Sequence, residues 1–186
     1  DAALSLRLLQ HINSAGQHGG AGFESIHQAV LWLGRDALYR WVARLLVRQA
    51  PARPAGLAVQ QFALARARLM ELLGRQAQAA WSGANAGVDA PTVGDMPAGM
   101  TPAGGLYLTG LVSLLPAMLS CRLDDALRSL PLPEAARQAL VGGRGPWAPH
   151  LRLAIALENA DEAQIRQLAG PFGGAAAVAA LSAQAW

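Results

Sequence analysis

The sequence predicts an all-α protein of about nine helices in a single domain. Its 186 residues are within the usual length of one domain. Apolar residues recur at helical spacing along the whole chain, and no stretch alternates with period two for long enough to predict a strand. With 53% hydrophobic and 15% charged residues, the composition excludes a largely disordered chain.

The first 50 residues are predicted to form three helices. The first covers residues 2–13 and is followed by a glycine-rich loop. A second helix, over about 24–33, has apolar residues at i, i+3, i+4 and i+7. Gly34 follows it, where a left-handed residue that ends a helix is expected. The third helix runs over about 35–49 and stops before two prolines.

The remaining chain is predicted to alternate between helices and breaks rich in proline and glycine. A fourth helix covers about 56–80, and the composition of residues 82–102 predicts a long loop. Further helices are expected over about 104–120, 123–130, 133–141, 148–159, 161–169 and 174–186.

A membrane span is not expected. Residues 96–121 carry no charge, but glycines and prolines interrupt them, and the continuous apolar part is about 17 residues where a span needs about 20. The segment therefore predicts a buried core helix. The chain shows no secretory signal at its start, and its single cysteine, Cys121, is typical of a reducing compartment. We expect a cytoplasmic protein.

The sequence contains no motif for the common catalytic chemistries. Its four histidines form no metal-binding pair at helical spacing, and its one cysteine excludes a structural zinc site. Nucleophile-elbow, P-loop and dinucleotide-binding motifs are absent. Arg122 would activate a nucleophilic Cys121, but a small core residue is the preferred interpretation. We predict no catalytic or metal-binding residue and no cofactor.

The basic charge is concentrated in one segment. All 15 basic residues are arginines, and residues 35–75 have a net charge of +6, whereas the other segments together have −3. Three arginines at i, i+4 and i+8 form a stripe on the third predicted helix. The stripe is interpreted as a solvated face, a contact surface for a protein partner, or a site for nucleotides or nucleic acid. The candidate interaction surface consists of Arg35, Arg40, Trp41, Arg44 and Arg48.

Several segments resemble the HDOD domain, a relative of the HD-type metal-dependent phosphohydrolases in bacterial signalling proteins. The opening residues LLQHINSA at 8–15 carry the resemblance, with Asn13-Ser14 and the later Leu33-Gly34 step as its most specific parts. The segments ALARARLMELLG at 63–74 and LYLTGLVSLLPAMLSCRLDDALRSLPLPEAARQAL at 106–140 are similar to the subgroup in which an HDOD domain follows an EAL domain of the cyclic di-GMP phosphodiesterase type.

The resemblance implies a single HDOD-like domain over residues 1–186, cut from a longer protein with an EAL domain upstream. It also implies that the catalytic centre is lost, because Ser113 and Leu114 stand where catalytic relatives have a His-Asp pair of metal ligands. Without such ligands no metal-bound water is activated.

The resemblance therefore implies a non-enzymatic regulatory module of a cytoplasmic signalling protein. Its expected partners are the upstream EAL domain and a further protein that remains to be identified, with nucleic acid and membrane insertion disfavoured. Three alternatives stay open: a nucleotide or nucleic-acid sensor that uses the arginine-rich helix, a residual metal-dependent phosphohydrolase, and a purely structural dimerisation domain.

Overall fold

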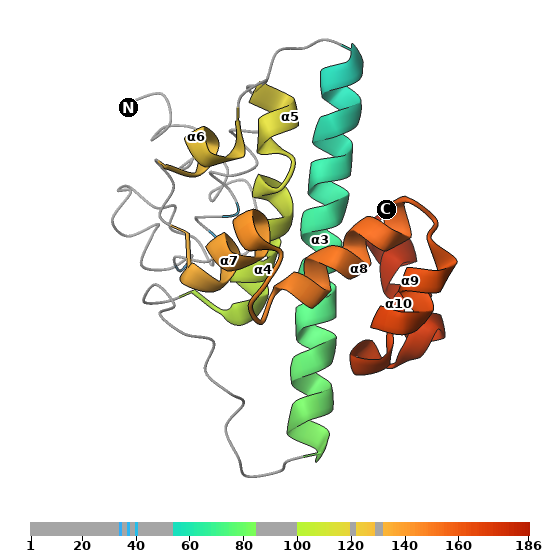
Figure 1. Ribbon diagram of the computed structural model, residues 1–186. Helices are drawn as coiled ribbons and strands as arrows, with labels where there is room; N and C mark the ends of the chain where they lie inside the picture. The colour runs from blue at the N-terminus through green and yellow to red at the C-terminus, as the bar shows by residue number, and fades with distance from the viewer. Residues whose placement is uncertain are drawn as a thin grey trace, which may run out of the picture.

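The computed structural model describes residues 54–84, 100–119, 122–128 and 132–186, together with Gly34, Ala37 and Arg40 (Figure 1). Every regular element in these ranges is a helix and none is a strand, which confirms the predicted all-α class. The predicted helices over 2–13 and 24–33 lie outside the described residues. The same holds for Cys121 and for the motif residues that precede Gly34. The total number of helices and the HDOD type stay predictions.

The described helices follow the expected order, although several boundaries differ. They are α3 (Pro54–Ala84), α4 (Pro102–Val112), α5 (Leu115–Leu119), α6 (Leu123–Arg128), α7 (Glu134–Gly142), α8 (Ala148–Glu158), α9 (Glu162–Leu168), the 3-10 helix η1 (Gly170–Phe172) and α10 (Gly174–Ala185).

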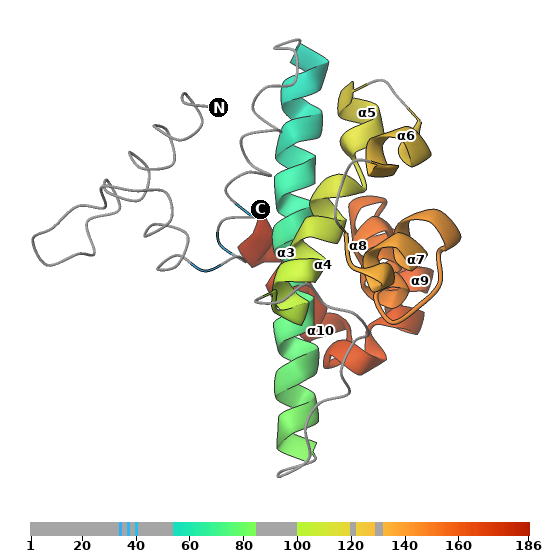
Figure 2. The ribbon, with the colours of Figure 1, turned by 90° about the vertical axis from the view of Figure 1, so that its left-hand side faces the viewer.

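Helix α3 is the central element of the described structure. Its 31 residues correspond to a length of about 46 Å, and α4, α8, η1 and α10 all pack against it. Figure 1 shows α8 crossing α3 at a steep angle, and Figure 2 shows α5, α6, α7 and α8 on one side of α3. A single long helix thus provides the surface on which the other helices assemble.

Helix α4 is buried along almost its whole length, as the sequence predicts for the uncharged segment. The side chain of Thr101 caps it by accepting a hydrogen bond from the Gly104 amide at 3.1 Å. All residues from Ala103 to Val112 are buried. Among the described residues, no helix combines the length and apolarity that a bilayer crossing requires.

Two glycines let α4 approach its neighbours closely. A Cβ atom at Gly110 would lie 2.8 Å from the Cα of Ala67 and 2.9 Å from the carbonyl oxygen of Arg66, so the backbones of α3 and α4 meet there. A Cβ atom at Gly105 would lie 2.2 Å from the indole of Trp147. The two glycines therefore give α4 close contact with α3 and with the large aromatic residue that precedes α8.

The predicted helix over 104–120 is wrong in one respect, because the chain breaks into α4 and α5 at Ser113 and Leu114. Pro116 explains the break. It has no amide hydrogen to donate to the carbonyl of Val112, and its ring would clash with that carbonyl in a continuous helix. The break places Ser113 at the end of α4.

The predicted loop over 82–102 also begins too early. Helix α3 continues through Ala84, because adding a turn to an existing helix costs little compared with starting one. At the other end, Met100 is already buried in the core. Residues 85–99 lie outside the described residues, so the rest of the predicted loop stays a prediction.

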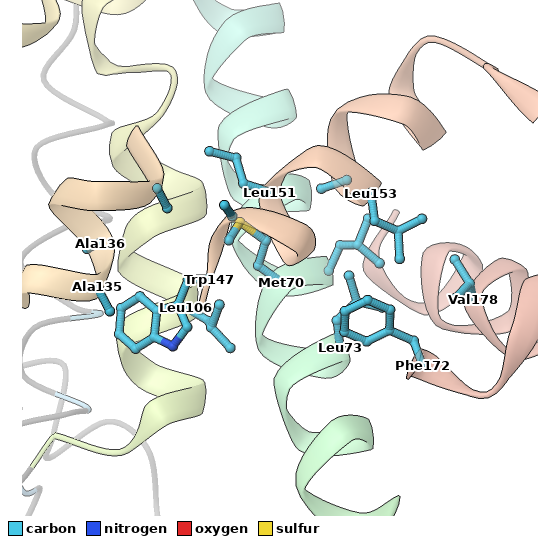
Figure 3. Close-up of a cluster of buried hydrophobic side chains, with 14 of the residues drawn as sticks. Met70, Leu73, Leu106, Ala135, Ala136, Trp147, Leu151, Leu153, Phe172 and Val178 are labelled. Carbon is cyan, nitrogen blue, oxygen red and sulfur yellow. The ribbon is translucent and has the colours of Figure 1, made fainter. Parts of the chain in front are cut away.

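The hydrophobic core has two parts. The larger part joins α3, α4, α7, α8, η1 and α10, and Figure 3 shows the Trp147 indole close to Leu106 and Ala135, with Phe172 close to Leu73. The smaller part packs α3 against α4 around Tyr107 and Leu111. Residues of α3 belong to both parts, so this helix is packed against the core along two of its sides.

Candidate functional site

A buried polar network joins α3, α4 and α8 at the end of α4. Arg66 Nε donates to Glu158 Oε1 at 2.7 Å, and Arg66 Nη2 pairs with Glu158 Oε2. The third nitrogen, Nη1, donates to the Ser113 hydroxyl at 2.8 Å, which itself donates to the Gly110 carbonyl at 2.6 Å. Every nitrogen of the guanidinium thus has a partner.

The network is largely shielded from water. The side chains of Arg66 and Glu158 are 10% and 11% exposed. Glu158 lies in the last turn of α8, where the helix dipole disfavours a carboxylate and where α8 has no basic residue of its own. Arg66 supplies the compensating charge from α3. The bidentate geometry also fixes the orientation of α8 relative to α3.

The close contact at Gly110 brings the third member into place. Because the α3 and α4 backbones touch at this glycine, Ser113, one turn further along, comes within hydrogen-bond distance of Arg66. A larger residue at position 110 would separate the helices at this point. The packing of α4 on α3 and the polar network are therefore parts of one arrangement.

A second charged cluster surrounds Glu71 on α3. Its side chain is 1% exposed and accepts hydrogen bonds from Arg40 and Arg75 on Oε1, each at 2.7 Å, and from Arg68 on Oε2 at 2.8 Å. The guanidinium carbon of Arg40 also lies 5.6 Å from the centre of the Tyr107 ring, in a cation–π arrangement. Three cations on one carboxylate give this cluster a formal charge of +2.

Two effects compete for the protonation of Glu71. Burial by itself raises the pKa of a carboxyl, but the hydrogen bond from Arg68 and the charges of Arg40 and Arg75 outweigh it, so the pKa of Glu71 is lowered. Glu71 is therefore ionised at neutral pH and holds the arginines in fixed positions.

His150, on α8, is a neutral histidine at neutral pH. Burial lowers its pKa to about 4, and an interaction with the Pro146 backbone offsets only part of the shift. Its ring packs edge-to-face on Phe172 with centroids 4.8 Å apart. The imidazole is therefore part of the apolar packing between α8 and η1.

Of the predicted arginine stripe, the structure describes Arg40 alone, and this residue points to Glu71 and Tyr107 inside the protein. Arg35, Trp41, Arg44 and Arg48 lie outside the described residues, so the candidate interaction surface as a whole stays a prediction. Of the motif residues, Gly34 has φ of 75°, the left-handed conformation that favours glycine. Asn13, Ser14 and Leu33 lie outside the described part.

Arg66, Glu71 and Glu158 were not among the site residues predicted from the sequence. A signal for Arg66 existed, because it shares a helix face with Ala63 and Met70, which are buried core positions. A charge on an apolar face predicts a buried partner. Nothing local identified Glu158, which is 92 residues away in sequence.

The residues around Ser113 do not suit a divalent cation. Such a site needs several imidazole or carboxylate ligands, whereas here an arginine already occupies both oxygens of the one carboxylate in the network. Throughout the part of the chain that the structure describes, no three histidine, cysteine, aspartate or glutamate residues come together.

Comparison with known proteins identifies one similar sequence of interest. The chain is 26% identical over 161 residues to the protein named Uncharacterized protein YuxH of Bacillus subtilis (strain 168). The similarity covers 86% of this chain and 34% of YuxH, so the chain spans about a third of the length of that relative. No protein-family model matches the chain, and no solved structure matches it.

Proposed function

We propose that this chain is a non-enzymatic signal-transduction module of HDOD type. In this proposal it belongs to a cytoplasmic bacterial protein of cyclic di-GMP signalling and makes contacts with an EAL domain of the same protein and with a further protein. The observation that carries the proposal is the position of the network formed by Arg66, Ser113 and Glu158.

Ser113 occupies the key position in this network. The resemblance puts the lost His-Asp pair of catalytic relatives at Ser113 and Leu114. At that place the chain has a hydroxyl bound by an arginine whose other nitrogens pair with Glu158. The arginine provides positive charge where a catalytic relative would need metal ligands, and it ties three helices together. This arrangement supports a structural role for the position that the resemblance matches to the catalytic centre of those relatives.

The comparison with YuxH supports the modular part of the proposal. The chain aligns with about a third of that protein, which is the relation expected of one module in a longer polypeptide. A module of this kind acts by contacting a neighbour differently in two states of that neighbour. The coding sequence upstream of Asp1 tests the association directly, because the proposal requires an EAL domain there.

A biochemical experiment separates the module from a residual phosphohydrolase. The purified chain is incubated with Mn²⁺ or Mg²⁺, desalted and analysed for bound metal, and its turnover of nucleotide phosphodiesters is measured beside a catalytic HD-type hydrolase. We expect neither stoichiometric metal nor turnover above buffer. Stoichiometric metal together with hydrolysis would contradict the proposal.

The contact itself requires a second measurement. The EAL domain and this chain are produced separately, and their binding is measured by calorimetry at low and physiological salt. Binding between the two halves is expected. If they do not bind and the EAL activity is the same with and without this chain, the proposed coupling is wrong.

A further inference from the structure

One side of α3 has five exposed residues within a span of about six helical turns. The exposed residues recur at spacings of four and seven, which places them on one stripe of the helix. We call these residues the α3 stripe: Leu57, Gln61, Arg68, Arg75 and Ala79. Between them on the same side, Leu64 and Leu72 are half-buried. The stripe therefore mixes aliphatic surface with two arginines.

The two arginines of the α3 stripe, Arg68 and Arg75, are held in place by the buried Glu71. Their side chains are 45% and 57% exposed, yet each donates a hydrogen bond to Glu71, which is almost fully buried. A guanidinium has five N–H donors in a rigid fork, so a single bond to Glu71 orients it and leaves its other edge toward solvent. Arg68 and Arg75 are seven residues apart, about 10.5 Å along the helix.

Charge sets the kind of partner. The Glu71 cluster has a formal charge of +2, because three arginines share one carboxylate. The segment 35–75 has a net charge of +6 in the sequence. An incoming carboxylate would meet guanidinium groups whose conformations are already restricted, which lowers the entropic cost of forming the contact.

The aliphatic character of the stripe favours a protein over single-stranded nucleic acid, which binds through stacking aromatic residues. The exposed aromatic residues Phe62 and Trp186 pack edge-to-face on each other, with centroids 4.9 Å apart. Phe62 is six residues from Arg68, so it lies roughly 120° away around α3. The aromatic pair is thus on a different face of the helix from the arginines.

We propose that the α3 stripe is the docking site for an acidic amphipathic helix of a protein partner. Glutamates or aspartates seven residues apart would pair with Arg68 and Arg75. Aliphatic residues between them would pack on Leu72, and an aliphatic residue one turn beyond the acid that pairs with Arg68 would pack on Leu64. This inference rests on the proposed function, because it names the chemistry of the protein partner that such a signal-transduction module would bind.

The test uses a fluorescent helical peptide of about 20 residues with glutamates at i and i+7 and leucines at i+3 and i+4. A second peptide has glutamine in place of each glutamate, and a third probe is a thymidine oligonucleotide. Binding to the folded chain is followed by fluorescence anisotropy at low salt. We expect the glutamate peptide to bind, the glutamine peptide to bind at least tenfold more weakly, and the affinity to fall with salt.

Variants of the chain connect the binding to the stripe. Arg68→Ala and Arg75→Ala each leave Glu71 with two arginine partners, so both variants should fold, which circular dichroism verifies. Each is expected to weaken peptide binding by about tenfold. The matched control is Arg166→Ala, which removes an exposed arginine of α9 and should leave binding unchanged.

Three results would overturn the docking site. They are absence of binding to the glutamate peptide, equal loss in Arg166→Ala, and tighter binding of the oligonucleotide with the same dependence on Arg68 and Arg75. These failures are distinct from failure of the proposed function. The proposed function fails if the chain shows metal-dependent hydrolysis, or if the activity of the EAL domain is the same with and without this chain. A hydrolytic chain would leave the peptide result untouched, and a failed peptide result would leave the metal measurements untouched.

Discussion

Removing either member of the Arg66–Glu158 pair is expected to destabilise the protein strongly. In Arg66→Met the Glu158 carboxylate loses both of its donor bonds, and in Glu158→Met the guanidinium loses its counter-charge, with each side chain only about a tenth exposed. A buried charge without its partner costs about 3–5 kcal/mol. Because a domain of ordinary stability has about 5–15 kcal/mol, urea unfolding followed by circular dichroism resolves this loss.

The double variant with methionine at both positions tests whether the single variants lose stability because one charge is left without its partner. It removes both charges and keeps apolar volume, so it should be far more stable than the sum of the single losses, with a coupling energy of at least about 3 kcal/mol. The control pair is Glu162 and Arg166, which is exposed and separated by 3.4 Å, and whose disruption should cost about 0.5 kcal/mol or less. The reasoning about the buried Arg66–Glu158 pair would be refuted if each single variant lost less than about 1 kcal/mol of unfolding free energy and the two losses were additive.

Three further predictions concern packing and pH. Gly110→Ala places a Cβ atom 2.8 Å from the Ala67 backbone and should destabilise by about 3 kcal/mol, whereas Gly170→Ala, with nothing within 4 Å, should change the unfolding free energy by about 0.5 kcal/mol or less; equal effects would show that the helices are not in backbone contact. The pKa of His150 falls from 6.5 to about 4 on folding, so the unfolded state binds the proton more tightly and stability should decrease by about 2 kcal/mol between pH 7 and pH 5. His150→Gln should lose that part of the pH dependence in urea titrations, and an unchanged slope would contradict the assignment. The pKa of Glu71 is lowered in the folded state, so its ionisation stabilises the fold above the ordinary carboxyl pKa, and this stabilisation should disappear as the pH falls through the folded-state pKa. In Glu71→Gln the unfolding free energy should therefore depend less on pH in the acid range. The same acid sensitivity in the variant would assign it to other groups.

Local patterns accounted for the helices that the structure describes. The 3.6-residue spacing of apolar positions located α3 and the helices from α6 onward, because an amphipathic helix must bury its apolar stripe. The errors lie where local rules compete. At Pro116 the apolar pattern continues although the hydrogen-bond pattern cannot, so one expected helix became α4 and α5.

The charged residues of the core were less accessible to sequence analysis. The predicted arginine stripe consists of Arg40, Arg44 and Arg48, and the one stripe arginine that the structure describes, Arg40, belongs to the Glu71 cluster. Arg66 stood on an apolar helix face and thereby signalled a buried partner. The identity of that partner depended on the packing of α8 across α3.

The sequence by itself determined that this protein is helical, that its uncharged segment is buried and that its basic charge is concentrated before residue 76. These properties depend on periodicity and composition, which are local. Only the tertiary structure decided which arginines are neutralised inside and which remain on the surface. That outcome depends on residues such as Arg66 and Glu158, 92 positions apart, which meet because α8 packs across α3. An unpaired charge in that interior would cost more than the ordering of its partner.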